Sequence, residues 1–144
     1  MKVVFLDIDG VLNNFGLIRR NGLDYIDEPM VGLLGGVVKR TGADIVLSSF
    51  WRLDPRDRSL VDSALKRHGM FVSDRTPSMP GPRADEISKW LQENPEVVRY
   101  AIIDDDEDAG VGMAHSFFQT DPEIGMTAHT AEMIVSHLNW GDDD

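Results

Sequence analysis

Short apolar segments alternate with amphipathic segments along the whole chain, and this alternation constrains the fold more than any other feature. The apolar segments are rich in β-branched and aromatic residues, which favours strands at residues 2–6, 44–47, 70–72, 97–103 and 116–119. Apolar residues recur at helical spacing over residues 29–41, 55–68, 84–94 and 128–138. We therefore expect an α/β fold, a doubly wound, Rossmann-like parallel sheet of about five strands with helices on both faces.

Proline, glycine and polar residues mark the limits of the predicted elements. Pro29 suits the first position of its helix, and Gly42 suits the carboxyl end. Residues 13–28 are polar and irregular, and residues 73–82 contain three prolines, so both segments are expected to be loops. Three glycines within the helix over residues 29–41 indicate close packing on the sheet.

Length and composition fit one globular domain. The chain has 144 residues, of which 42% are apolar, and we expect the domain to cover residues 1–140 with an acidic tail at residues 141–144. The absence of cysteine excludes disulfides, cysteine-ligated zinc and thiol catalysis. No apolar run reaches the ~18 residues of a membrane helix, and the apolar start is too short for a signal peptide. The expectation is a soluble, cytoplasmic protein that does not bind membranes.

Charge is distributed unevenly along the chain. The 14 basic and 25 acidic residues give a net charge of −11, yet residues 1–99 are neutral overall, because residues 100–144 contain no basic side chain. A basic footprint for nucleic acid is absent, so we expect no tight binding to long duplexes. The acidic run at residues 104–108 directly follows an apolar segment, where uncompensated carboxylates are costly. This position indicates a compensating cation.

Polar side chains stand at the carboxyl ends of three predicted strands. The first strand is followed by Asp7 and Asp9, the second by Ser48 and Ser49, and the fourth by Asp104 and Asp105. Doubly wound folds bind ligands at this edge of the sheet. Residues i and i+2 of an extended chain share a face, so Asp7 and Asp9 should point the same way, and such carboxylates suit Mg²⁺. The alternative for Asp7 to Gly10 is an Asp-Gly hairpin between residues 3–6 and 11–12.

Several arginines are candidates for binding a phosphate group. Arg83 follows a proline and opens a predicted helix, where a cation could neutralise phosphate charge. Lys89 lies further along the same helix and is a weaker candidate, and Arg52 follows the second strand end closely. Each of these basic residues could also be an ordinary surface residue, and Trp51 could simply pack in the core. The functional prediction therefore depends on the order of these features along the chain.

That order resembles the four motifs of the haloacid dehalogenase (HAD) superfamily. A strand is followed by Asp-Ile-Asp-Gly-Val-Leu, a second strand by Ser48, a basic residue opens a helix, and a later strand is followed by Asp-Asp. Residues 3–12 match the first motif, and Arg83 stands where the superfamily often has lysine. Residues 47–52, 86–91 and 120–127 are similar to the small HAD domains of RNA-repair proteins.

The resemblance implies a capless HAD-type phosphatase, a phosphoric monoester hydrolase. Asp7 would be the nucleophile that forms an aspartyl-phosphate, and Asp9 would act as general acid and then as general base. Mg²⁺ would be held by Asp7, the backbone carbonyl of Asp9 and the pair Asp104 and Asp105, with Asp105 favoured as the direct ligand.

The resemblance also assigns the groups that bind the phosphate. Ser48 and Arg83 would hold phosphoryl oxygens in the transition state, and Ser49 would lie beside them on the substrate. A second acid two residues after the nucleophile marks phosphatases and phosphotransferases in this superfamily, so Asp9 argues against a dehalogenase.

Loop lengths bear on the substrate. The superfamily usually takes its specificity from a cap domain inserted after the first or third strand, and neither loop here reaches the ~50 residues of a domain. An open site favours a nucleotide or the phosphorylated end of a nucleic acid, with Arg19, Arg20 and Arg52 on the flanking backbone or base. Two alternatives remain: a receiver-like signalling domain, and a catalytically idle HAD-fold binding module.

Overall fold

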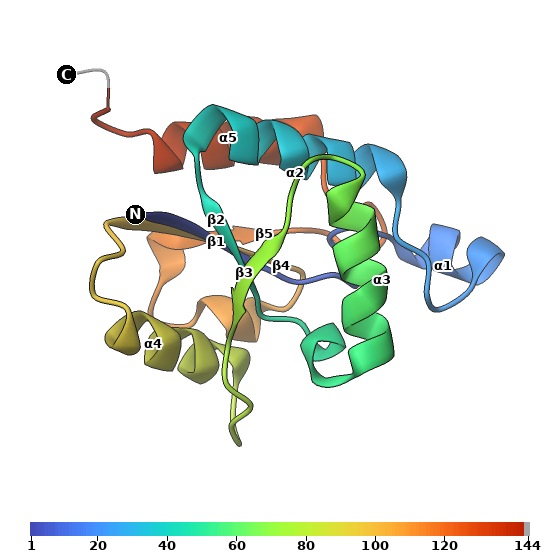
Figure 1. Ribbon diagram of the computed structural model, residues 1–144, viewed down its shortest axis with the longest axis horizontal. Coiled ribbons are helices and arrows are strands. Elements are labelled where there is room, and N and C mark those ends of the chain that lie inside the picture. Colours follow the sequence, from blue (N-terminus) through green and yellow to red (C-terminus); the bar gives the residue numbers. More distant parts are fainter. Residues whose placement is uncertain (143–144) are drawn as a thin grey trace.

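The computed structural model describes residues 1–142, and these residues form one five-stranded sheet with helices around it (Figure 1). The strands are β1 (Lys2–Leu6), β2 (Asp44–Leu47), β3 (Val72–Arg75), β4 (Arg99–Asp104) and β5 (Phe117–Gln119). The α-helices are α1 (Phe15–Asn21), α2 (Glu28–Thr41), α3 (Pro55–Lys66), α4 (Arg83–Glu93) and α5 (Ala128–Leu138). Short 3₁₀ turns lie between these elements, at η1 (Phe50–Leu53) after β2 and at η2 (Glu107–Gly110) and η3 (Ala114–Ser116) between β4 and β5.

The strand order is β3-β2-β1-β4-β5, and every neighbouring pair is parallel. β1 lies in the middle, with Leu6 opposite Leu47 of β2 and Ile103 of β4. The predicted doubly wound parallel sheet is therefore confirmed. The hairpin alternative is excluded, because both neighbours of β1 are parallel strands.

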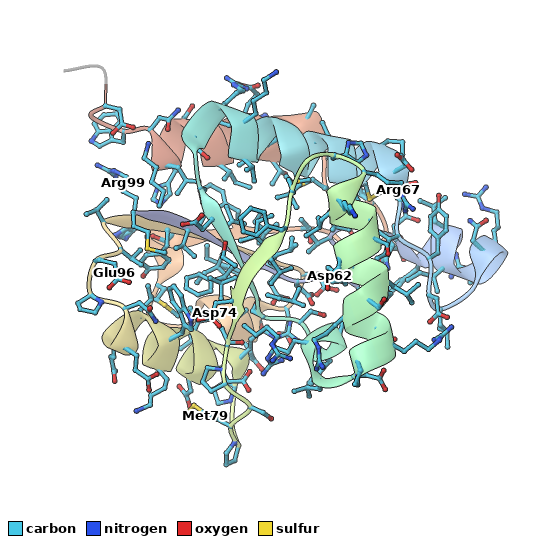
Figure 2. The ribbon with its side chains drawn as sticks, viewed as in Figure 1. Asp62, Arg67, Asp74, Met79, Glu96 and Arg99 are labelled. Carbon is cyan, nitrogen blue, oxygen red and sulfur yellow. The ribbon has the colours of Figure 1, made fainter. Side chains whose placement is uncertain are left out.

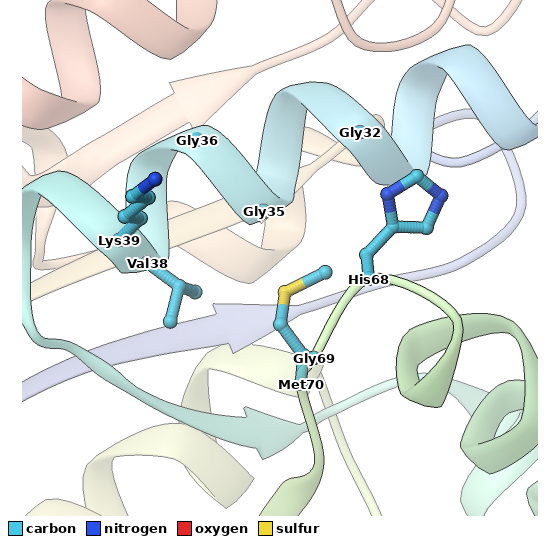
Figure 3. Close-up of a pocket in the computed structure, with 8 residues that line it drawn as sticks. All are labelled: Gly32, Gly35, Gly36, Val38, Lys39, His68, Gly69 and Met70. Carbon is cyan, nitrogen blue, oxygen red and sulfur yellow. The ribbon is translucent and has the colours of Figure 1, made fainter.

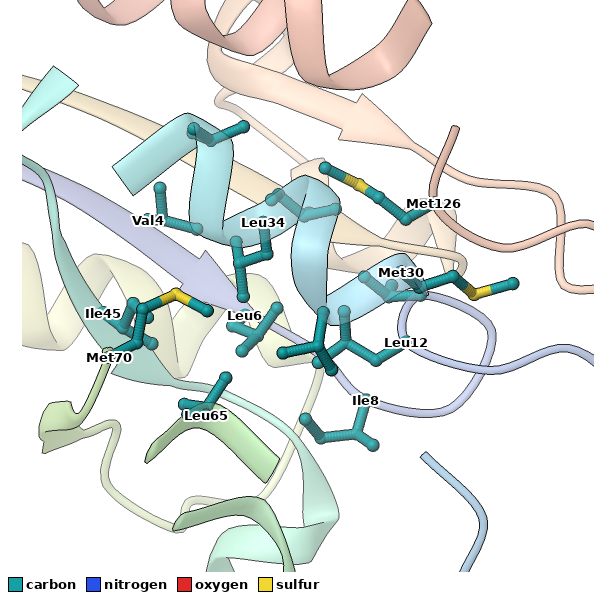
Figure 4. Packing of buried hydrophobic residues seen from close by; sticks show 14 of the residues in the cluster. Val4, Leu6, Ile8, Leu12, Met30, Leu34, Ile45, Leu65, Met70 and Met126 are labelled. Atoms are coloured by element: carbon teal, nitrogen blue, oxygen red, sulfur yellow. The ribbon is translucent and has the colours of Figure 1, made fainter. Parts of the chain in front are cut away.

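Alternation along each strand divides the core into two layers. Val4 and Leu6 of β1 pack with α2, α3 and α5, whereas Val3 and Phe5 pack with α4. Figure 1 shows α2 and α5 together on one side of the sheet and α4 on the other. Figure 4 shows the first layer from close by, with Leu6 among side chains from several elements. The helices thus cover both faces, as predicted.

One helix occupies a segment that was predicted to be a loop. The side chain of Asn14 caps α1 by accepting a hydrogen bond from the backbone N–H of Leu17 at 2.9 Å, and the backbone N–H of Gly22 bonds to Ile18 at the other end. No residue of α1 is fully buried. The helix therefore leaves no apolar stripe in the sequence, which is why periodicity misses it.

The third strand lies further along the chain than predicted. Residues 70–72 were expected to form it and residues 73–82 to be loop, but β3 extends from Val72 to Arg75. β3 is an edge strand whose last three residues are exposed, so polar side chains are tolerated there. The loop is confined to residues 76–82. The limits of the other predicted elements differ from the structure by at most two residues.

The glycines of α2 face a turn rather than the sheet, which corrects the packing prediction. A Cβ at Gly32 would lie 3.6 Å from the His68 ring, and one at Gly35 would lie 3.5 Å from the Met70 side chain. These residues line a groove of about 430 Å³ between α2 and the turn before β3 (Figure 3). Gly42 ends α2 with a positive φ of 71°, as its predicted position requires.

Charged side chains project outward around this core. On α3, Val61 and Leu65 face the core, whereas Asp62 lies on the exposed side (Figure 2). Near the chain end, Lys2 forms an ion pair with Asp142. The rest of the predicted acidic tail, residues 143–144, lies outside the described residues. Among residues 1–142, no helix combines the length and apolarity needed to cross a membrane.

Candidate active site

The sheet ladder continues one residue past the ends of β1 and β2. The backbone N–H of Asp7 donates to Ile103 at 3.1 Å, and that of Ser48 donates to Leu6 at 3.0 Å. Because side chains alternate, Asp7, Ser48 and Asp104 follow residues of the α2 layer and fall on the face that α4 covers. The polar residues of three strand ends are thereby brought to one edge, as the sequence predicts.

Three carboxylates meet at this edge. Asp7, Asp104 and Asp105 each offer one oxygen, and these oxygens all lie within 4.8 Å of one another. Asp104 is completely buried, and it accepts hydrogen bonds from the Asp106 backbone N–H at 3.0 Å and from Arg83 at 2.6 Å. Asp105 is only half-buried. The cluster could hold a metal ion, with Asp104 already anchored within the protein.

Burial is the largest cause of the pKa shifts of Asp7 and Asp105. It raises the pKa of Asp7 well above its ordinary value, and the nearby charge of Asp104 raises this pKa further, while Arg83 lowers it. Burial, followed by the charge of Asp104, raises the pKa of Asp105 to about 6. Arg83 alone does not compensate the negative charge of the cluster, so the site favours an additional cation.

Arg83 is the first residue of α4 and reaches both buried carboxylates. Its Nη1 lies 3.2 Å from Asp7 Oδ1 and 2.6 Å from Asp104 Oδ2. Burial lowers the pKa of Arg83, but Asp7 and Asp104 offset this effect and the net shift is upward. Lys89, the competing candidate, is exposed and pairs with Glu93 at 3.3 Å. The cation of the site is therefore Arg83.

Asp9 has different neighbours from Asp7. Its carboxylate is exposed and accepts hydrogen bonds from Asn13 Nδ2 at 3.0 Å and from Trp51 Nε1 at 3.2 Å. The extended geometry that would align Asp7 with Asp9 stops at Asp7, because a turn begins at Ile8. The carboxylate of Asp9 does not belong to the three-carboxylate cluster. The sequence analysis does not identify Asn13 and Trp51, which hold Asp9, because it assigns Asn13 to a loop and Trp51 to packing.

Gly10 allows the first motif to lie against the acidic pair. Its φ is +78°, and a Cβ there would lie 2.3 Å from the Asp105 carboxylate. The hydroxyl of Thr120 donates to the Gly10 carbonyl at 2.6 Å, and Gly10 N–H donates to Asn13. A glycine is therefore required both by the backbone conformation and by the close approach.

The hydroxyl of Ser48 is buried and has no hydrogen-bond partner among the described residues. An unsatisfied buried hydroxyl is costly, so this atom fits a ligand oxygen at the strand end. The side chain of Ser49, in contrast, accepts a hydrogen bond from the Trp51 N–H at 3.2 Å and caps η1. Ser49 thus has a structural role, and its predicted contact with substrate is not supported.

The four sequence motifs lie at one edge of the sheet. They are the Asp-x-Asp strand end, the serine, the arginine that opens a helix, and the acidic pair. A family model described as "HAD domain in Swiss Army Knife RNA repair proteins" matches residues 3–131. The chain belongs to this HAD family. The predicted family is therefore confirmed, and the chain is an HAD-family domain.

A solved structure is similar to the chain as well. It is a haloacid dehalogenase-like family hydrolase from Streptococcus pneumoniae, with 16% identity and a TM-score of 0.45. The match covers 82% of this chain and 58% of the other, so this HAD domain spans less than two thirds of that protein's length. No curated protein gives a significant match to the chain.

Arg52 is not available to a substrate in this HAD domain, which corrects its predicted role. Its side chain is 2% exposed and pairs with Glu86 at 2.8 Å. Its remaining N–H groups donate to backbone carbonyls, including those of Thr76 at 3.0 Å and Ser49 at 2.8 Å. Arg52 therefore ties η1 to the loop before α4 and to α4 itself.

The structure does not join Arg19 and Arg20 to the carboxylate cluster. Both are exposed in the last turn of α1, and neither forms an ion pair with another residue of the described chain. Their proposed contact with the flanking part of a substrate stays a prediction.

Replacing Arg52 by Ala should destabilise the fold by about 3–5 kcal/mol, because Glu86 would remain buried without its partner. Chemical denaturation of the purified variant measures the change. Arg56→Ala is the matched control, since Arg56 forms an exposed pair with Asp24 and its loss should leave the free energy of unfolding nearly unchanged. An Arg52 variant of normal stability with a raised KM would restore the substrate role.

Proposed function

We propose that this HAD domain is a Mg²⁺-dependent phosphomonoesterase that acts through an aspartyl-phosphate on nucleotide or nucleic-acid-end phosphates. The position of Asp7 carries the proposal. Its carboxylate lies 3.2 Å from Arg83 Nη1 and belongs to a cluster with Asp104 and Asp105. A nucleophile placed between a guanidinium and a set of metal-ligating oxygens suits attack on a dianionic phosphate ester, whose charge would otherwise repel it.

The donor set fits Mg²⁺. All three side chains offer hard carboxylate oxygens, which Mg²⁺ prefers, and burial together with the charge of Asp104 raises the pKa values of Asp7 and Asp105. Asp104 already uses both oxygens in hydrogen bonds, so Asp7 and Asp105 would hold the ion most directly. When bound, Mg²⁺ would supply Lewis-acid stabilisation of the phosphoryl oxygens.

Asp7 and Asp9 have different roles in the proposed reaction, Asp7 as the nucleophile and Asp9 as the general acid and base. A carboxylate oxygen of Asp7 attacks phosphorus as the bond from phosphorus to the ester oxygen breaks, and Asp9 protonates the departing alcohol. Asp9 then takes a proton from water as that water attacks phosphorus, which releases inorganic phosphate and regenerates Asp7. The hydrogen bonds from Asn13 and Trp51 support this role, because they fix the orientation of the exposed Asp9 carboxylate.

Ser48 and Arg83 bind the phosphoryl group in this proposal. The unpartnered Ser48 hydroxyl donates to one phosphoryl oxygen, and the guanidinium of Arg83 approaches another. Both groups are held in place before substrate arrives, Ser48 by the sheet ladder and Arg83 by Asp104. Such preorganised donors stabilise charge as it develops in the transition state.

The loop lengths support a large or extended substrate. Between β1 and α2 the chain forms only the seven-residue helix α1 with its connections, and residues 76–82 separate β3 from α4. Neither segment is long enough for a cap domain, so the strand-end edge is open to a nucleotide or a nucleic-acid terminus. The name of the matched family, which refers to RNA repair, supports the same substrate class.

The two alternative functions have less support. Receiver-like domains have the flavodoxin-like strand order 2-1-3-4-5, whereas this sheet has the order β3-β2-β1-β4-β5. An idle binding module would lack a motif residue, and here Asp7, Asp9, Ser48 and an acidic pair are all present, with Arg83 in place of lysine. A screen of phosphate esters with Mg²⁺ tests the proposal directly.

Asp7→Asn should reduce phosphatase turnover by several orders of magnitude, because an amide is a poor nucleophile. Steady-state release of inorganic phosphate measures the loss, and circular dichroism checks the fold. Asp62→Asn is the control, since Asp62 is exposed on α3. Near-normal turnover by folded Asp7→Asn would exclude Asp7 as the nucleophile.

Mg²⁺ should raise the melting temperature more at pH 7.5 than at pH 5, and a chelator should abolish turnover. The pKa of Asp105 is raised from 3.8 to about 6, so the metal-free fold loses stability as pH rises through this window. A metal ion needs the ionised carboxylates, so its stabilising effect grows over the same window. Thermal unfolding with and without Mg²⁺ measures both effects. An equal shift at the two pH values would contradict the assignment.

Arg83→Ala should lower kcat by roughly 100- to 1,000-fold, as the loss of a transition-state donor does. Arg83→Lys should retain part of the activity, because a lysine can supply the charge but not the forked contact. Lys89→Ala should behave like the unaltered protein. If Lys89→Ala were the more damaging substitution, the basic residue of the site would be assigned wrongly.

Phosphorylated oligonucleotides and nucleotides should be better substrates than hexose or triose phosphates, because an open site cannot enclose a small sugar. Values of kcat/KM over a panel with 3′- and 5′-phosphates test this order. The highest kcat/KM for a small sugar phosphate would show that the open edge does not determine the choice of substrate.

A further inference from the structure

Phe50 places an exposed aromatic ring at the edge of the candidate active site. The residue follows Ser48 and Ser49, is 73% exposed, and has the guanidinium carbon of Arg83 5.1 Å from its ring centroid. Arg83 in turn contacts Asp7. A continuous chain of contacts therefore leads from the exposed ring to the proposed nucleophile.

The turn that carries Phe50 is held firmly. Ser49 caps it, and its two central residues, Trp51 and Arg52, are buried. In a 3₁₀ turn residues i and i+3 lie above one another, so Leu53, which is 50% exposed, continues the apolar surface of Phe50. The turn thus presents an apolar face to solvent on a rigid support.

This placement differs from that of Phe71, another exposed aromatic residue. Phe71 is exposed to the same degree, at 72%, but it precedes β3 and lies at the amino ends of the strands, away from the candidate site. Phe50 lies at the carboxyl ends, where the proposed function places the phosphate. The location of the ring, rather than its exposure, points to a ligand.

We propose that the Phe50 ring is a stacking platform for the base of the nucleotide whose phosphate enters the site. The inference rests on the proposed phosphatase function and names the residue that recognises the base. An aromatic ring accepts any base, since every base has a flat π-face, and Arg83 covers one side of Phe50 without enclosing it. The site would therefore require a base next to the phosphate but would not distinguish one base from another.

The experiment compares two oligonucleotides that differ only in the terminal nucleotide, at whichever end the unaltered protein dephosphorylates. One carries a base on that nucleotide and the other has an abasic sugar. The ratio of their kcat/KM values is measured for the unaltered protein and for Phe50→Ala, Phe50→Trp and Phe71→Ala. Stacking predicts a ratio of roughly 5- to 150-fold for the unaltered protein.

Phe50→Ala should reduce this ratio to near one, while Phe50→Trp and Phe71→Ala should keep it. Equal losses on both oligonucleotides in Phe50→Ala would mean that the ring only positions Arg83, and the inference would fall. A protein that dephosphorylates both oligonucleotides equally well before any substitution would also overturn it, with the phosphatase function intact. A protein inactive on every phosphate ester would instead overturn the proposed function and the inference with it.

Discussion

The guanidinium of Arg83 makes it possible to bury two carboxylates at the edge of a parallel sheet. Asp7 and Asp104 lie on neighbouring strands with almost no exposure, and each would be costly without a counter-charge. Arg83 contacts both, and it can do so because α4 begins at the level where β1 and β4 end. The compensation is incomplete, since the pKa of Asp7 remains raised. The cluster of Asp7, Asp104 and Asp105 could therefore hold a further cation at this edge.

The sequence predicts the sheet and this edge well because both depend on local signals. A parallel strand buried on both faces is a run of apolar residues, and its end is visible where polar residues begin. Asp7, Ser48 and Asp104 stand at such ends, so the topology brings them together without further information. Arg83 was found for a similar reason, because its proline marks the start of a helix.

Contacts between distant side chains were not predictable in the same way. Arg52 looks like a surface arginine, since its partner Glu86 is 34 residues away and nothing local shows the pairing. Trp51 looks like a core residue, yet its indole N–H holds the exposed carboxylate of Asp9. Helix α1 has no fully buried residue, and β3 has three exposed residues, so hydrophobic periodicity reports neither correctly.

The exposed end of β3 has a consequence for the solubility of the folded chain. An edge strand offers unpaired backbone groups to any other extended chain, and a long apolar edge invites addition of foreign strands. β3 has only four residues, and the last two are Asp74 and Arg75. The indole N–H of Trp90 donates a hydrogen bond to the Asp74 carboxylate at 2.8 Å. A strand from another molecule would have to bury those charges to pair there. The same polar residues that obscure the strand in the sequence therefore protect the sheet from growing at that edge.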